Sequence, residues 1–216
     1  MHHARQHAET RTRERRRRLA HEAARLMAES GIRDYHQAKR KAADRLGIHD
    51  DASLPRNSEI EDALRESQRL FQGDTQAAGL RARRDAALRA LEFIAPFDPR
   101  LGGPVLDGTA DRHSPVALHV YTDDDGSVSR LLDAHMIPAE SRSRRIRLDR
   151  ERAIDVGVWV FSAEDLTFDV AVLPSDALRQ APLSSVDEKP MKRASLSQLR
   201  ELIAQDEIAA YEAGAT

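Results

Sequence analysis

The chain has 216 residues, of which 40% are hydrophobic and 32% charged, enough for one large domain or two small ones. Its formal net charge of -2 argues against a bulk polyanion binder, and the lack of cysteine excludes disulfides, thiolate metal sites and a cysteine nucleophile. No apolar run approaches the roughly 20 residues of a membrane span and no secretory signal is visible, so we expect a cytoplasmic protein without membrane contact.

Helical spacing of apolar residues dominates the N-terminal part of the chain. We expect residues 1–12 to be a disordered basic tail and residues 13–97 to form a helical region. The first helix covers residues 14–30, and the second covers 33–46 and ends at Gly47. Because only a short turn separates these two helices, we expect them to pack as an antiparallel hairpin.

Two further helices complete this region. The third begins at Asn57 or Ser58, either of which can cap it, and ends before Gly73. The fourth covers residues 75–95 and stops at Pro96, which cannot continue a helix. Four helices with almost no aromatic side chains indicate a helical subdomain, or a helical layer around the C-terminal half of the chain.

Four consecutive arginines, Arg15, Arg16, Arg17 and Arg18, lie near the start of the first helix. Cations in the first turn oppose the helix dipole, so a run of them needs an explanation. One explanation is a contact with nucleic acid or with an acidic protein, which would make binding steeply salt-dependent. The other is a solvated helix face or a disordered lead-in, and the sequence leaves both open.

After residue 97 the apolar spacing changes to alternation, which indicates strands. We expect strands over 104–107, 116–121, 143–148, 155–161 and 166–173, with one helix over 127–135. The strand over 143–148 is rich in arginine, which guards a sheet edge against pairing, so we place it at an edge. Residues 98–180 then form a small mixed β-sheet core, and 181–216 a proline-containing linker and a last helix. The fold class is α+β: a helical N-terminal region, then a small mixed β-sheet domain with flanking helices.

Three polar residues of this core are candidate catalytic residues. Asp169 lies in the middle of an apolar strand, where a carboxylate is costly unless it is paired, exposed or used. His119 could face Asp169 from a neighbouring strand and act with it as a general base or hold a metal, or make only a structural hydrogen bond. Asp107 precedes a glycine turn, so it is either a third member of this group or a simple turn cap.

The turn after Asp107 is a candidate anion site. Gly108 and Thr109 could present backbone N–H groups to a phosphate, although a tight turn explains the same residues. Arg112 follows within reach of such a ligand. The arginines of the strand over 143–148 could also meet phosphate or carboxylate groups, or serve only as edge guards.

Three segments of the core follow one another in an order known from a family of enzymes. Residues 105–110 look like a strand that ends in a pair of small residues, and residues 114–120 stand where a two-acid strand would follow. Residues 168–170, Phe-Asp-Val, look like a later strand that carries a third acid. This pattern resembles the nucleotidyltransferase superfamily with the polymerase-beta-like core.

The resemblance implies a nucleotidyltransferase-like core and a nucleotide ligand, but it departs at the metal acids. Two of the three expected acids fall on Pro115 and Ala117, which cannot hold a cation, so only Asp169 would remain for Mg²⁺ or Mn²⁺. Under this interpretation Asp169, His119 and Asp107 are the catalytic candidates, and Gly108, Thr109 and Arg112 bind the nucleotide. The alternative is a catalytically inactive module of the same fold that binds nucleic acid or an acidic partner through its arginine-rich helices. The sequence does not decide whether the protein is an enzyme.

Overall fold

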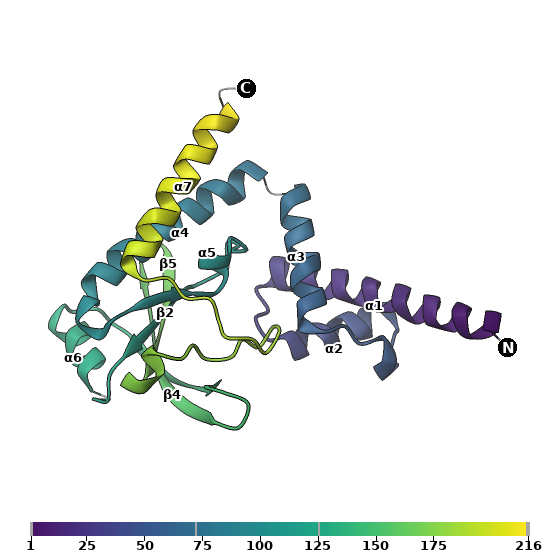
Figure 1. Ribbon diagram of the computed structural model, residues 1–216, viewed down its shortest axis with the longest axis horizontal. Helices are drawn as coiled ribbons and strands as arrows, with labels where there is room; N and C mark the ends of the chain where they lie inside the picture. The colour runs from purple at the N-terminus through teal and green to yellow at the C-terminus, as the bar shows by residue number, and fades with distance from the viewer. Residues whose placement is uncertain (1, 72, 125, 215–216) are drawn as a thin grey trace. The chain divides into compact units, whose positions relative to one another are not determined.

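The computed structural model describes the backbone of residues 2–71, 73–124 and 126–214, and the side chains of 9–67, 77–124 and 126–212 (Figure 1). The chain divides into two compact units. Unit 1 comprises Met1–Asp74 with Ser185–Asp187, and unit 2 comprises Thr75–Ser184 with Glu188–Thr216. The division falls two residues into the fourth helix, because the rest of that helix packs its apolar side chains into the core of the sheet. The α+β fold class is confirmed.

Unit 1 is helical. It contains α1 (His2–Ser30), α2 (Tyr35–Leu46), the short η1 (Asp51–Ser53) and α3 (Asn57–Phe71). The first helix begins well before the expected position, so the predicted disordered tail over 1–12 is wrong from residue 2 onward. The physical reason is that this stretch has no glycine or proline, and its two alanines, two arginines, one glutamine and one glutamate favour helix.

The ends of α2 explain why its position was predictable. Asp34 caps its start, since the side chain accepts a hydrogen bond of 2.7 Å from the backbone N–H of Gln37. Gly47 ends it in the left-handed conformation at φ 63°, with its N–H directed to the carbonyls of Ala43 and Asp44. A side chain at Gly47 would be strained there, which is why glycine marks this helix end in the sequence.

The core of unit 1 is built largely from alanine. Half of its fourteen buried hydrophobic residues are alanines, and the others include Leu19, Met27, Ile60 and Leu64. Small side chains at helix contacts allow close approach of the backbones, so α1, α2 and α3 pack tightly with few large residues. The ion pair of Arg45 on α2 with Glu22 on α1, at 3.1 Å, supports the expected hairpin of the first two helices.

Unit 2 combines a five-stranded sheet with helices. Its helical elements are α4 (Gly73–Phe93, of which the first two residues belong to unit 1), η2 (Ala95–Phe97), α5 (Gly103–Asp107), α6 (Ser127–Ala134), η3 (Ser175–Leu178) and α7 (Leu196–Gly214). Its strands are β1 (Arg100–Gly102), β2 (Val116–Tyr121), β3 (Glu140–Arg147), β4 (Ala153–Ala163) and β5 (Leu166–Leu173). The strand order is β1-β2-β5-β4-β3, with β2 and β5 parallel and every other pair antiparallel. The expected mixed sheet and the edge position of the arginine-rich strand are confirmed.

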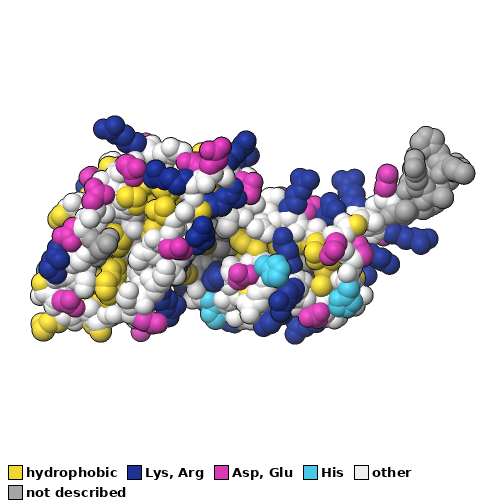
Figure 2. Space-filling model, turned by 90° about the horizontal axis from the view of Figure 1, so that it is seen from below, with side chains coloured by type: hydrophobic (Ala, Val, Ile, Leu, Met, Phe, Trp, Pro, Cys, Tyr) yellow, Lys and Arg dark blue, Asp and Glu magenta, His cyan; other side chains and the backbone are white. Residues whose placement is uncertain are grey.

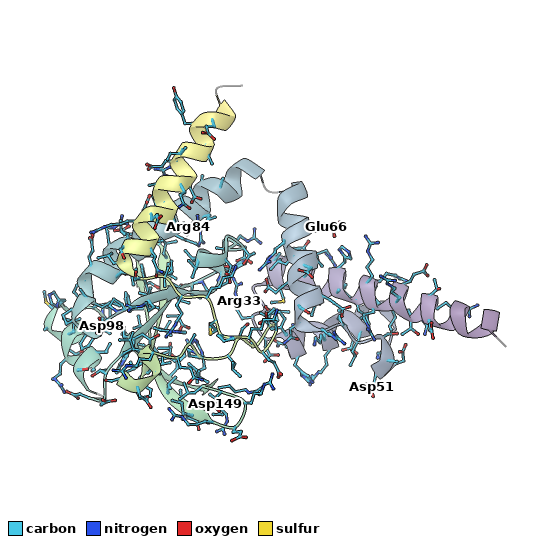
Figure 3. All side chains as sticks on the ribbon, in the orientation of Figure 1. Arg33, Asp51, Glu66, Arg84, Asp98 and Asp149 are labelled. Carbon is cyan, nitrogen blue, oxygen red and sulfur yellow. The ribbon has the colours of Figure 1, made fainter. Side chains whose placement is uncertain are left out.

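One face of the sheet is covered by helices. Leu118 of β2 and Val170 of β5 share a buried cluster with Leu91 of α4 and Leu199 of α7. Arg84 of α4, only 5% exposed, ties this layer together, since it forms an ion pair with Asp206 of α7 and donates to two carbonyls of α5 (Figure 3). The helices therefore fix which face of each strand is left for other contacts.

The predicted strand over 104–107 is wrong, because these residues form the short helix α5. Pro104 fits the first turn of a helix, where its missing N–H costs nothing. Gly108 closes the helix in the left-handed conformation at φ 76°. The strand that pairs with β2 is instead Arg100–Gly102, so the chain enters the sheet earlier than its apolar pattern indicated.

Candidate functional site

Polar side chains lie on the sheet face opposite α4 and α7, which we call the polar face. The same face carries a second buried apolar cluster that includes Val158, Ala171 and Leu173 of the sheet and Ala177 of η3. In the parallel register of β2 and β5, Ala117 lies opposite Asp169, and His119 lies opposite Ala171. Residues paired in this way project from the same face, so His119 and Asp169 share it, as predicted. The antiparallel register of β3, β4 and β5 brings Arg144 to the same face.

The partner of Asp169 is an arginine and not the histidine. The two terminal nitrogens of Arg144 donate to the Asp169 carboxylate: Nη1 to Oδ1 at 2.9 Å, and Nη2 to Oδ2. The Asp169 side chain is 13% exposed and that of Arg144 is 47% exposed. A bidentate, half-buried pair of this kind is stronger than ordinary surface ion pairs and fixes the orientation of both groups. It also neutralises the charge of the carboxylate that the sequence analysis expected to bind a metal ion.

His119 is a buried, neutral histidine. It is only 6% exposed, and burial lowers its pKa from 6.5 to about 4, helped by the charges of Arg193 and Arg144 and opposed by Asp169. Its Nδ1 atom is buried and finds no hydrogen-bond partner among the residues that the structure describes. Most buried polar atoms have a partner, and one without costs about 1–3 kcal/mol.

A second arginine, which the sequence analysis missed, anchors the other part of the site. Arg193 lies in the segment before α7, and its Nη1 donates to the Tyr121 hydroxyl at 2.5 Å and to the Ala177 carbonyl at 3.1 Å. Its Nη2 donates to the Leu178 carbonyl at 3.2 Å, and the guanidinium lies 5.7 Å from the centre of the Tyr121 ring. No periodicity marks an arginine in a linker, so the only signal was the position of Tyr121 on the same strand face as His119.

The predicted loop residues do not join this site. The N–H groups of Gly108 and Thr109 donate to the carbonyl of Pro104, the latter at 2.9 Å, so they close α5 and the tight-turn alternative applies. Gly108 lies against the side chains of Leu80 and Arg84 on α4. The carbonyl of Arg112 likewise accepts a bond from Arg83 of α4, while Asp107 is the exposed last residue of α5. These residues therefore belong to the helical side of the sheet.

Within the described parts of the chain, no three histidine, aspartate or glutamate side chains come together in a way that could hold a metal ion. The position opposite Asp169, where a second acid would complete a carboxylate pair, is Ala117. The positive charge that pairs with the Asp169 carboxylate is the guanidinium of Arg144.

The arginine run of α1 is partly used within unit 1. Arg15 pairs with Asp50 at 3.3 Å, Arg16 donates to the Ala52 carbonyl at 2.6 Å, and Arg17 contacts His21. Arg18 is exposed. Basic side chains lie on several sides of the described part of α1, at the right of Figure 2.

A groove of about 710 Å³ runs between α1 and α3. Its α1 wall carries Arg13, Arg16 and Arg17, and its α3 wall carries acidic residues that include Glu59 and Asp62. Two walls of opposite charge suit neither a polyanion nor a polycation, so we do not assign the groove to nucleic acid or to an acidic protein.

Comparison with known proteins found no protein-family model, no curated protein and no solved structure that matches this chain. The resemblance to nucleotidyltransferases therefore stays a hypothesis that rests on the residues quoted for it. None of the helices in the described ranges has the length and apolar character to cross a bilayer.

Proposed function

We propose that unit 2 binds a phosphate-bearing small molecule, with a nucleotide as the first candidate, on the polar face of its sheet. The observation that carries this proposal is His119, a buried neutral imidazole whose Nδ1 lacks a partner among the described residues and whose pKa is lowered by burial and by two nearby guanidinium groups. A site that combines fixed positive charge with an unsatisfied polar atom favours an anionic ligand that also offers a hydrogen-bonding group.

The two arginines of the site are suited to phosphate. A guanidinium has five N–H donors in a planar fork, and Arg144 uses two of its donors on Asp169 while it stays 47% exposed. Arg193 is held by Tyr121 and by backbone carbonyls, so its position is set before a ligand arrives. Preorganised donors lose little freedom on binding, which raises affinity.

On this proposal the domain is nucleotidyltransferase-like but does not perform metal-dependent transfer. Phosphoryl transfer relies on metal ions that bridge phosphate oxygens and neutralise developing charge. Pro115 and Ala117 stand where two of the expected metal acids would be, and Arg144 already compensates the third, Asp169. The chemistry left to the site is binding of the anion, with His119 as a neutral hydrogen-bonding group.

The test is calorimetric titration of the full chain with each of the four nucleoside triphosphates, with and without Mg²⁺ or Mn²⁺. Replacing Arg144 with alanine should weaken binding by about tenfold or more, as expected for a lost charge-assisted hydrogen bond. The matched control is Arg145→Ala, which removes the neighbouring guanidinium on the opposite strand face, where it pairs with Asp155 at 3.2 Å. This control should leave affinity unchanged.

Three outcomes would contradict the proposal. An absence of binding heat for every nucleotide, or an equal loss of affinity in Arg145→Ala, would remove the polar face as a phosphate site. Incorporation of labelled nucleotide with Mg²⁺ or Mn²⁺ that is lost in Asp169→Ala would show that the site is catalytic after all. Fluorescence of Trp159, the only tryptophan, verifies that each variant is folded.

A second candidate function is nucleic-acid binding through α1, with an acidic protein as the alternative partner. The exposed arginines Arg11, Arg13, Arg15, Arg17 and Arg18 lie along a helix that turns about 100° per residue, so Arg13 and Arg17 fall roughly opposite the other three. A helix with cations on two opposite sides fits the DNA major groove, which has phosphates on both walls, better than one flat protein surface. Substituting Arg13, Arg17 and Arg18 with alanine should weaken duplex binding and flatten its salt dependence, while nucleotide binding to unit 2 persists.

A further inference from the structure

The outer edge of β3 is an open strand edge. This strand is last in the sheet order, and seven of its eight residues are exposed. It pairs with β4 along its whole length, from Glu140 opposite Val160 to Arg147 opposite Ala153. Its other side therefore offers backbone groups to a further strand, which proteins usually avoid in long edges.

The direction of these backbone groups follows from one hydrogen bond. The carbonyl of Arg147 points away from β4, because it accepts a bond of 2.7 Å from the N–H of Leu183. In an antiparallel pair, alternate residues direct both their N–H and their carbonyl to the same side. Ser141, Ser143 and Arg145 therefore present donors and acceptors outward along the edge.

The side chains of the edge are strongly basic. Four of its eight residues are arginines, against the single acid Glu140. A turn of the same chain already contacts one end of this edge, since Leu183 donates to the Arg147 carbonyl and Glu188 pairs with the Arg147 guanidinium at 2.8 Å. Along Ser141, Ser143 and Arg145, which are exposed, the sheet has no further strand within the described ranges.

We propose that the β3 edge binds an extended acidic peptide, which adds to the sheet as a further strand. Backbone hydrogen bonds to Ser141, Ser143 and Arg145 would supply affinity, and alternate carboxylates would meet Arg142 and the neighbouring arginines. The present partners of those arginines are mostly exposed, as in the pair of Arg142 with Glu140 at 2.8 Å. Exposed pairs are worth only about 0–1 kcal/mol, so they yield readily to an incoming carboxylate.

Two other occupants fit the edge less well. A second copy of β3 would bring two arginine-rich strands together, and like charges across a strand pair are destabilising. A nucleic-acid backbone offers phosphate acceptors but no regular donors, so it would leave the outward carbonyls of Ser141 and Ser143 unmatched. The proposal goes beyond the phosphate site because it rests on the outward backbone groups of the β3 edge, which the phosphate site does not use.

The experiment uses a labelled peptide of about ten residues that alternates glutamate with threonine, long enough to span β3. Anisotropy titration of the full chain should show binding of this peptide and none of the same peptide with lysine in place of glutamate. A third peptide, with proline at its central threonine, should bind about tenfold or more weakly, because proline removes a ladder donor. Equal binding of the proline and glutamate–threonine peptides would overturn strand addition.

A variant of the protein tests whether the peptide binds to the backbone of the β3 edge. In Ser143→Pro the outward N–H is lost while the bonds to β4 remain, since proline is tolerated on edge strands. This variant should bind the acidic peptide about tenfold more weakly, whereas Ser143→Thr should bind it as well as the natural chain. Nucleotide binding should be unchanged in both.

The remaining outcomes also decide the question. If an oligonucleotide displaces the peptide and binds Ser143→Pro and the natural chain equally well, the edge is a general anion surface and the proposal fails. If Ser143→Pro does not fold, the peptide series on the natural chain decides between strand addition and its absence. Slower amide exchange at Ser141, Ser143 and Arg145 with bound peptide would support strand addition directly.

Discussion

Units 1 and 2 reach a buried core by different means. In unit 1 half of the buried hydrophobic residues are alanines, whereas the main cluster of unit 2 has three alanines among sixteen and is rich in leucine, valine and phenylalanine. Apolar burial stabilises by roughly 25 cal/mol per Å², so large side chains contribute most. The comparison teaches that unit 2 is stabilised mainly by burial of large apolar side chains. Unit 1 depends more on close helix contacts, caps and ion pairs.

The two units also differ in what they bury besides apolar groups. The polar face of unit 2 holds a nearly buried histidine, but the described histidines of unit 1, His21, His36 and His49, all lie at least partly exposed. Trp159 lies in β4, so its fluorescence reports on unit 2 alone. Stability measurements can therefore separate the units, and changes to single side chains can sharpen or break the comparison.

The largest effect is expected for Leu91→Ala. This residue is fully buried between α4 and the sheet, and truncating it loses apolar burial and leaves a cavity. We expect unit 2 to lose about 2–5 kcal/mol of unfolding free energy, measured by denaturant titration with Trp159 fluorescence. The control is Met136→Ala at a residue that is 89% exposed, which should change stability by less than about 0.5 kcal/mol. A similar loss of unfolding free energy in both variants would contradict the view that buried large side chains stabilise unit 2.

The next effect is a loss of unit 2 stability in acid, caused by His119. Its pKa is about 4 in the folded chain and 6.5 in an unfolded one, so below pH 6.5 the unfolded state binds the proton first. Stability from this group is full above pH 6.5 and falls as the pH drops to about 4. At about 1.4 kcal/mol per pKa unit the loss is on the order of 3 kcal/mol.

The measurement is the pH dependence of unfolding free energy by Trp159 fluorescence in the natural chain and in His119→Gln. The variant has no titrating group at this position, so its stability should depend less on pH between 6.5 and 4. A slope that is unchanged by the substitution would show that other groups cause the acid sensitivity and that His119 is not a buried neutral base.

The smallest effect concerns the cap of α2 in unit 1. Asp34→Ala removes the oxygen that accepts the N–H of Gln37, and should cost about 0.5–2 kcal/mol, seen as an earlier helical transition in circular dichroism. Asp34→Asn keeps a capping oxygen and should cost only a few tenths of a kcal/mol. The fluorescence transition of unit 2 should not move in either variant, and a shift there would mean that the units unfold together.

Much of the fold was predictable because local chemistry and tertiary packing agree. The second helix was recognisable from its apolar spacing and from Gly47, and the strand over 116–121 matches β2 because alternation over six residues has one simple interpretation. The prediction of a strand over 104–107 was wrong, since a short apolar run with a proline fits a first helical turn as well as a strand. The early start of α1 was missed because a polar chain terminus rich in histidine and arginine is typical of fraying, although alanine, arginine and glutamate favour helix.

The candidate site was predictable only in part. Alternation along two strands placed His119 and Asp169 on one face, but the sequence does not contain the register that brings Arg144 to the carboxylate. Arg193 reaches Tyr121 from a linker that lies far away in sequence. Partners of this kind depend on the tertiary fold and leave no periodic signal. The loop from Gly108 to Arg112 was assigned to the site by resemblance and lies against α4 instead.

The parallel pairing of β2 with β5 sets the order in which unit 2 can assemble. Strands β3, β4 and β5 follow one another in the chain and can pair through short connections, whereas β2 must wait for β5, the last of the strands in sequence. Closing such a long loop costs entropy before its contacts form, so long-range parallel pairing slows folding. The polar face is therefore completed in the last step, and a nascent chain acquires His119 long before it has Asp169 beside it.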